Sequence, residues 1–166
     1  GYITSSFFPT LREDLIAGRN FYAEEDEFGK ANVVLLSHKL WKSRYNENAD
    51  VIGEAITLDG KSYTVVGVVN PNFKFLEVGD ADIWMPAAAR QWAESRGNGW
   101  LRCFGRLKDG VTYEQAQTEM NVILAGMRDI YPEHYTEHEL LVRRYGEDNV
   151  EELRVAFLIL FGGVGF

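Results

Sequence analysis

The stretch EAITLDGKSYTVVGVV, residues 54–69, decides the fold of this chain. Two runs rich in apolar and β-branched residues flank Asp59-Gly60, a dipeptide that tolerates the positive φ angles of a tight type I′ turn. The GKS sequence at residues 60–62 imitates the end of a phosphate-binding loop. That motif, however, needs a glycine where Ala55 stands and a helix after the serine. We therefore predict a β-hairpin and no phosphate site.

The segments around this hairpin carry their own strand and helix signals. Residues 31–37, ANVVLLS, form a compact apolar run that suits a buried strand. Ser37 is the predicted N-cap of a helix over residues 38–46. Residues 7–11 favour a short aromatic helix, and residues 82–86, DIWMP, predict a short strand that a proline closes. This half of the chain is thus predicted to be rich in β-structure.

The clearest helix signal lies downstream, over residues 112–131. Thr112 and Gln115 form a capping box, in which each side chain satisfies a backbone N–H of the first turn. Strand signals at residues 100–107 and 139–144 flank the helix and predict a β-α-β unit. We therefore expect an α+β fold with two lobes. The helix should bury one apolar stripe, formed by Ala116, Met120, Ile123, Leu124, Met127 and Tyr131.

The bulk composition excludes one class of function. A formal charge of -8 and a pI near 4.9 argue against a nucleic-acid groove, which requires a basic stripe. With 46% hydrophobic and 25% charged residues, the chain is typical of a globular protein. The single cysteine, Cys103, cannot form an internal disulfide, and its apolar strand signal predicts an inert core thiol. Because the chain starts at Gly1 and not at Met, we interpret it as a piece of a longer protein.

The chain ends in its most apolar stretch, VAFLILFGGVGF at residues 155–166. As a helix this run is about 18 Å long against a hydrocarbon core of about 30 Å, but the chain stops before the run does. Its glycines and its lack of a polar face favour a membrane helix. Asn149 and Glu152 form a capping box that opens this helix, after an approach whose shortage of basic residues suits the outer side of a membrane. We predict that residues 149–166 begin a truncated transmembrane helix, with a buried core helix or strand as the alternative.

No set of residues in the sequence predicts catalysis. His134 and His138 lie four residues apart, as zinc ligands on a helix can, but Tyr135 stands where a metalloprotease has its glutamate. Trp92 and Trp100 can stack on a sugar or a peptide, which makes an extracytoplasmic ligand-binding module the main alternative function. Core or partner packing is the simpler role for these tryptophans. We therefore predict no catalytic residue, no bound cofactor and no metal in this chain.

Several segments, taken in order, resemble one family: the MacB-like periplasmic core domain of ABC-transporter permeases, in particular the acidobacterial type. The likeness lies in residues 33–75, in ADIWMP at 81–86 and in the stretch from RLKDGVTYEQAQTEM at 106–120 through YPE at 131–133. The sequence departs from the family pattern in two ways. REDLIAGR follows Leu11, where the family has a Gly-x-x-Pro turn. The family's domain also starts earlier, with a further β-α-β unit. The lead-in to these segments, residues 1–28, also follows the family pattern. The matching positions are Phe7, Phe8, Leu11, Gly18, Arg19, Phe21, Glu25 and Asp26.

The resemblance implies a division into lobes. Residues 1–28 would be a lead-in belonging to a porter-like lobe, and residues 29–96 a β-rich sabre-like lobe. Residues 97–148 would form the porter-like β-α-β lobe, and residues 149–166 the start of the membrane helix. The porter-like lobe would be partial, so we expect a sheet edge that another copy can cover.

The resemblance also implies a non-enzymatic role in the bacterial inner membrane, with this domain on the periplasmic side. Expected partners are a second permease copy in a homodimer, a cytoplasmic ATPase unit that binds ATP, and a periplasmic adaptor like that of the best-known members. Membrane-helix motion would pass to this domain for efflux or mechanotransmission. We expect a coupling joint to the membrane helix at Asn149, Glu152 and Arg154, and structural roles for Asp59, Gly60 and Trp84.

Overall fold

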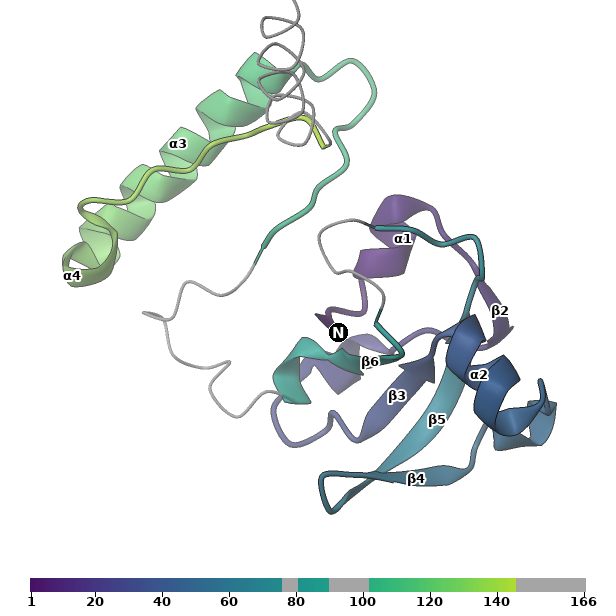
Figure 1. The fold of residues 1–166 in the computed structure, drawn as a ribbon. Coiled ribbons are helices and arrows are strands. Elements are labelled where there is room, and N and C mark those ends of the chain that lie inside the picture. Colours follow the sequence, from purple (N-terminus) through teal and green to yellow (C-terminus); the bar gives the residue numbers. More distant parts are fainter. Residues whose placement is uncertain (76–80, 90–101, 146–166) are drawn as a thin grey trace, which may run out of the picture. The chain divides into compact units, whose positions relative to one another are not determined.

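The computed structural model describes residues 1–75, 81–89 and 102–145. The chain divides into two units, Gly1–Arg106 and Leu107–Phe166 (Figure 1). Unit 1 holds a six-stranded sheet with short helices, and the described part of unit 2 consists of helices and extended chain. The fold is therefore α+β, as predicted.

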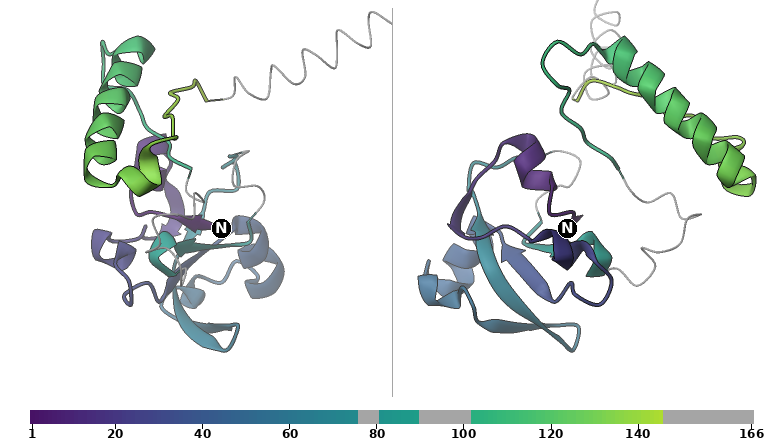
Figure 2. Two further views of the ribbon diagram at one scale, coloured as in Figure 1. Left: turned by 90° about the vertical axis from the view of Figure 1, so that its left-hand side faces the viewer. Right: turned by 180° about the vertical axis from the view of Figure 1, so that it is seen from behind.

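The longest strand, β5, is the spine of the sheet in unit 1. It pairs in parallel with β3, and its other edge pairs antiparallel with both β2 and β4. β6 continues the sheet beyond β3, and β1 closes that edge in parallel with β6. In all views the tip of the β4–β5 hairpin and helix α1 lie at opposite ends of the unit (Figure 2). The bounds are β1 Tyr2–Ile3, α1 Phe7–Leu11, β2 Leu15–Gly18, β3 Val33–Leu36, α2 His38–Tyr45, β4 Ala55–Leu58, β5 Lys61–Val69 and β6 Ile83–Pro86, with short 3-10 turns at Ala23–Asp26, Ala49–Val51 and Ala87–Ala89.

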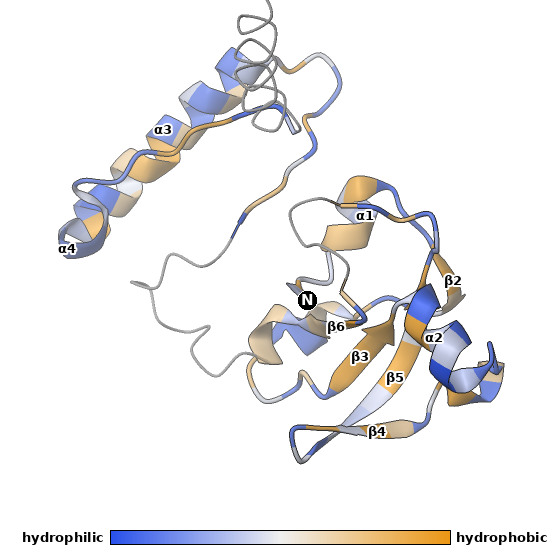
Figure 3. Cartoon of the chain, in the orientation of Figure 1, coloured by the Kyte–Doolittle hydropathy of each residue, from blue (hydrophilic) through white to orange (hydrophobic). Residues whose placement is uncertain are grey.

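Strands β3 and β5 are apolar throughout their centres because both faces of the sheet are covered there (Figure 3). Val34 and Leu36 face one cluster, which α2 covers through Leu40 and Trp41. Leu35 faces the other cluster, which contains residues of α1 and β6. The continuous apolar run that predicted a buried strand at residues 31–37 therefore reflects burial on both faces.

The local signals around the hairpin are confirmed. Ser37 Oγ accepts the Leu40 N–H at 3.0 Å and caps α2. Asp59 and Gly60 form the two-residue turn between β4 and β5. Their φ angles are 49° and 78°, and a type I′ turn requires positive φ at both positions. The GKS sequence thus lies at a hairpin turn and not before a helix.

The lead-in, residues 1–28, contributes to the same sheet as residues 33–86. It supplies β1, β2 and the predicted aromatic helix, which is confirmed as α1. Phe8 and Phe21 lie in one core cluster with Trp84. The lead-in, which we expected to belong to a porter-like lobe, is therefore grouped with the β-rich part of the chain, since its apolar side chains fill one face of that sheet. The division into lobes at residues 28/29 and 96/97 stays a prediction.

Unit 2 is built on α3 (Tyr113–Ile130), which is followed by the short helix α4 (Pro132–Tyr135). The predicted capping box is confirmed. Gln115 Oε1 accepts the Thr112 N–H at 2.8 Å, and Thr112 Oγ1 accepts the Gln115 N–H at 3.3 Å. The predicted stripe is only partly covered by the described residues: Ala116 and Leu124 are buried, Met120, Met127 and Tyr131 are half-buried, and Ile123 is exposed.

The predicted strands on either side of α3 are wrong for the described residues. Residues 102–107 and 139–144 form no strand, and residues 100–101 lie outside the described part. Period-two alternation shows which side chains share a face, but a strand also needs a neighbour for its backbone N–H and C=O groups. No described strand lies beside either segment. Of the predicted β-α-β unit, the described residues form only the helix.

Candidate functional site

A salt bridge closes the loop that follows β2. Arg19 donates from Nη1 to Glu25 Oε2 at 2.9 Å and from Nη2 to Glu25 Oε1 at 2.7 Å. The carboxylate also accepts the Tyr22 N–H at 2.8 Å, and the guanidinium lies 3.9 Å from the Tyr22 ring centroid. Burial raises the pKa of Glu25, but the hydrogen bonds from Arg19 and Tyr22 outweigh burial, so this pKa lies below its ordinary value. We call Arg19, Tyr22 and Glu25 the lead-in clasp.

Two further contacts join this loop to the start of the chain. Both oxygens of the Asp26 carboxylate accept the Ser5 N–H, at 2.9 and 3.1 Å. Asn20 Nδ2 donates to the Ser5 carbonyl at 2.7 Å. Ser5 lies just before α1, so the loop fixes the approach to the helix that carries Phe7 and Phe8.

Two glycines bring β2 close to β5 immediately before the clasp. Gly18 and Gly67 lie opposite each other in the ladder. A Cβ on Gly18 would lie 2.2 Å from the Val66 carbonyl oxygen, and a Cβ on Gly67 would lie 2.7 Å from the Arg19 carbonyl oxygen. The Arg19 N–H donates to the same Val66 carbonyl at 2.8 Å. This close approach places Arg19 where its side chain reaches Glu25.

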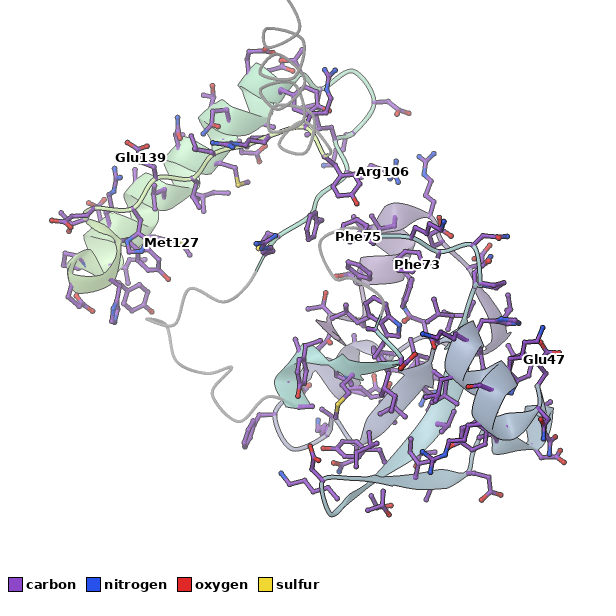
Figure 4. The ribbon with its side chains drawn as sticks, in the orientation of Figure 1. Glu47, Phe73, Phe75, Arg106, Met127 and Glu139 are labelled. Carbon is purple, nitrogen blue, oxygen red and sulfur yellow. The ribbon has the colours of Figure 1, made fainter. Side chains whose placement is uncertain are left out.

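Trp84 lies in an aromatic cluster with residues of α1, and Phe73 and Phe75 of the same cluster lie beside α1 (Figure 4). Its ring centroid is 6.2 Å from that of Phe7, 6.0 Å from Phe8 and 5.8 Å from Phe73. Phe75 stacks on Phe73 with centroids 6.3 Å apart. The Trp84 side chain is buried, and its Nε1 finds no hydrogen-bond acceptor in the described chain. The cluster ties α1, β6 and residues 73–75 together.

The last residues of unit 1, 102–106, contact this aromatic cluster and α1. Phe104 packs edge-on against Phe75 with centroids 4.7 Å apart, and Arg106 Nε donates to the Thr10 carbonyl at 2.9 Å. Cys103, next to Phe104, is exposed. The prediction of a buried core thiol is therefore wrong, because without a neighbouring strand this segment lies on the surface.

In unit 2 the chain returns along α3 as an extended segment, residues 139–145 (Figure 1). The Gln117 side chain holds it: Nε2 donates to the Leu140 carbonyl at 2.6 Å, and Oε1 accepts the Val142 N–H at 2.7 Å. One side-chain amide therefore takes the place that a neighbouring strand has in a sheet.

The chain is also held against α3 at both ends of this extended segment. Near the C-terminal end of the helix, Arg128 donates to the carbonyls of Tyr135 and His138. Near its N-terminal end, the Arg144 guanidinium lies 4.9 Å from the Tyr113 ring centroid. The segment thus runs antiparallel to the helix.

The described part of unit 2 leaves many apolar side chains in contact with solvent. Exposure reaches 68% for Val122 and Ile130 and 63% for Leu141. The exposed large apolar residues in the described part of unit 2 are Tyr113, Val122, Ile123, Ile130, Leu140, Leu141 and Tyr145.

The structure leaves several sequence-based candidates unplaced. The predicted coupling joint, Asn149, Glu152 and Arg154, and the predicted truncated membrane helix lie outside the described residues, as do Trp92 and Trp100. Within residues 1–75, 81–89 and 102–145, no helix has the length and apolar character needed to cross a bilayer.

His134 and His138 do not share a helix face. His134 lies in α4, whereas His138 follows the end of that helix. The Tyr135 ring packs against both imidazoles, with centroids 6.3 and 5.8 Å away. In the described part of the chain, no group of three His, Cys, Asp or Glu side chains gathers around a common point.

Sequence reasoning missed the roles of three polar side chains. From the sequence, Arg19 and Glu25 were identified only as positions in the family pattern of the lead-in, and no role was predicted for Gln117. The available signal was a pair of opposite charges six residues apart around an aromatic residue. For Gln117, it was a polar residue beside the apolar stripe of α3.

A family model described as the MacB-like periplasmic core domain matches residues 1–123, which include the sheet, the lead-in clasp and more than half of α3. The chain belongs to this family. Members are periplasmic domains of ABC-transporter permeases, so the match places this domain on the extracytoplasmic side of the inner membrane. No curated protein sequence matches the chain.

Two solved structures resemble this MacB-like domain. The periplasmic region of MacB from Actinobacillus actinomycetemcomitans has 14% identity and a TM-score of 0.48, over 81% of this chain and 57% of that one. A domain assigned to a permease protein from Porphyromonas gingivalis has 16% identity and a TM-score of 0.50, over 91% of this chain and 68% of that one. The chain therefore spans little more than half the length of the first of these structures.

Proposed function

We propose that this MacB-like domain transmits motion between the membrane helices of its permease and partners in the periplasm, for efflux or mechanotransmission, without catalysis of its own. The family match over residues 1–123 carries the proposal. Two charged groups of the lead-in support a non-catalytic role because their hydrogen bonds stabilise the fold. Arg19 is committed to Glu25, and Asp26 to the backbone of Ser5.

A transmitting domain has to move as a body, and unit 1 has the construction for this. Its central strands are covered on both faces, and close-packed cores transmit strain instead of absorbing it. The lead-in clasp and the Asp26–Ser5 contact fasten the first residues of the domain to the same core. A displacement applied at the lead-in therefore reaches the whole sheet.

The remaining parts of the machine lie on other chains or other segments. ATP binds a cytoplasmic ATPase unit, and this domain contributes no cofactor site. The permease that carries this domain forms a homodimer with a second copy of itself. A periplasmic adaptor receives the movement of the domain. Asn149, Glu152 and Arg154 form the joint to the membrane helix that starts in residues 149–166.

A flexible Gly-Ser insertion between Asn149 and Arg154 of the intact permease tests this role. We expect transport to fall while ATPase activity stays, because the outer domain no longer follows the helix. A control insertion of equal length at the exposed turn of Asp109 and Gly110 should leave transport intact. Unchanged transport with the insertion at the joint would contradict the proposal.

A further inference from the structure

The chain leaves unit 1 along residues 102–106, which belong to no helix or strand, and unit 2 begins at the next residue. Two side chains fix this exit (Figure 4). The Phe104 ring packs edge-on against Phe75, with centroids 4.7 Å apart. Arg106 Nε donates to the Thr10 carbonyl at 2.9 Å. We call Phe104 and Arg106 the junction anchor, because they hold a stretch of chain that has no helix or strand hydrogen bonds.

The junction anchor connects the exit of unit 1 to α1. Thr10 is a residue of α1, and the Phe75 ring lies 5.2 Å from that of Phe7 in the same helix, centroid to centroid. Phe7 in turn stacks on Trp84 of β6, with centroids 6.2 Å apart. Phe75 is buried and Phe104 is half-buried, so their contact is part of the packed aromatic cluster. The anchor therefore reaches the sheet through α1 and this cluster.

The way in which residues 102–106 are held decides whether a displacement passes along them. Five extended residues without an anchor can span roughly 17 Å, and slack chain of this length absorbs a displacement before it becomes taut. Close-packed side chains have low compressibility and transmit strain. The anchor therefore passes a displacement of residue 106 directly to α1. The Asp26–Ser5 contact fixes the approach to the same helix, so α1 moves together with the lead-in loop.

We propose that Phe104 and Arg106 are positioning residues, through which motion of unit 2 enters unit 1 at α1. This inference rests on the transmission role proposed above and adds the residues at which the movement is passed on. Without the anchor, unit 2 still follows the membrane helix, whereas unit 1 no longer follows unit 2. Neither residue belongs to the two core clusters of the described sheet, so loss of the anchor should leave the fold of unit 1 intact.

Fluorescence energy transfer to the membrane tests this inference and requires no transported substrate. The intact permease and its ATPase unit are placed in nanodiscs whose lipids carry an acceptor fluorophore. Cys103→Ser removes the native thiol of this domain. A donor fluorophore is attached at Lys61→Cys, beside the hairpin turn of unit 1, or at Glu119→Cys, on α3 of unit 2, and both positions are exposed. The change in transfer efficiency on addition of ATP and vanadate is measured at each position.

In the original permease we expect an ATP-dependent change at both label positions. Phe104→Ala/Arg106→Met should reduce the change at Lys61→Cys about three- to ten-fold, because unit 1 is no longer held to the chain that moves it. The change at Glu119→Cys should stay, because unit 2 lies on the membrane side of the anchor along the chain. A residue that only stabilised the fold would not separate the two positions in this way.

Rescue and control variants make the test specific. Arg106→Lys should retain most of the change at the unit 1 label, because its ammonium group can still donate to the Thr10 carbonyl. The control Arg12→Met/Phe28→Ala removes an exposed arginine and an exposed phenylalanine of unit 1 outside the anchor, and it should have no effect. Thermal unfolding of each variant of the full chain checks the fold. If the Phe104 substitution lowers the unfolding midpoint, Arg106→Met alone serves as the test, since it removes one exposed hydrogen bond.

The anchor and the transmission role fail with different results. An unchanged response at Lys61→Cys in the double variant would overturn the anchor, because unit 1 would then follow unit 2 through another contact. Loss of the response at both positions in the double variant would also overturn it, since the effect would not be confined to unit 1. No response at either position in the original permease would overturn the transmission role on which the anchor rests.

Discussion

Arg19 and Glu25 form a two-pronged salt bridge, with N–O distances of 2.9 and 2.7 Å, at the point where the lead-in meets the sheet. Glu25 is the one charged residue of the described chain that is buried. The bridge therefore fixes a loop that has neither helix nor strand hydrogen bonds of its own beyond a single 3-10 turn.

Removal of one partner of this bridge should destabilise unit 1. Arg19→Met leaves the Glu25 carboxylate buried without its cation, and we expect a loss of about 1–3 kcal/mol in the free energy of unfolding. Chemical denaturation monitored by tryptophan fluorescence measures the change, since Trp84 lies in the same core cluster as Phe21 of this loop.

The matched control for this substitution is Lys30→Met, which removes the exposed ion pair between Lys30 and Glu27. Exposed pairs of this kind contribute little to stability. Equal unfolding midpoints for Arg19→Met and the original chain would refute a structural role for the clasp.

The bridge also predicts a direction for the pH dependence of stability. The pKa of Glu25 is lower in the folded chain than in the unfolded chain, where it is about 4.3. Its contribution is therefore complete above that value and is lost as the pH falls through the lower, folded pKa. In acid titrations of unfolding, Glu25→Gln should flatten this part of the stability curve. A curve with the original slope would show that another carboxylate is responsible.

The turn at Asp59-Gly60 gives a test of backbone conformation alone. Gly60 has a φ of 78°, and a Cβ added there meets no atom within 4 Å. Gly60→Ala should therefore cost about 1–2 kcal/mol through the left-handed backbone conformation, not through a clash. Gly105→Ala is the control, because Gly105 has equal space and no positive φ. Equal stability of the two variants, measured by thermal unfolding, would argue against the type I′ turn.

In unit 2, Gln117 should control the order of the returning segment. Gln117→Ala removes both of its bonds to the backbone of Leu140 and Val142, so we expect faster hydrogen exchange at the Val142 amide. Thr118→Ala, which removes a bond within α3 from Thr118 to the Glu114 carbonyl, should leave that exchange rate unchanged. Protection of Val142 that survives loss of Gln117 would mean that another group holds the segment.

The sequence was most informative where the determining interactions are local. The Ser37 cap, the Thr112–Gln115 capping box and the Asp59-Gly60 turn each depend on residues within four positions of one another. The apolar runs of β3 and β5 predicted strands because burial on both faces leaves a strong signal.

Prediction failed where the outcome depends on a distant neighbour. Residues 102–107 belong to an alternating run and residues 139–144 carry a strand signal, but a strand forms only beside a partner, and the sequence pattern does not show whether one is present. The exposure of Cys103 follows from the same cause. The Arg19–Glu25 bridge was missed because its geometry depends on the close approach of Gly18 to Gly67, a contact between strands far apart in the sequence.

The position of this domain on the outer face of the membrane can be tested through Cys103, which is exposed. The intact permease with Cys103 as its only cysteine is treated in spheroplasts with a maleimide that does not cross membranes. We predict labelling before the membrane is permeabilised, and none in the Cys103→Ser variant. Labelling that occurs only after permeabilisation would place this domain on the cytoplasmic side of the membrane and would rule out a periplasmic role.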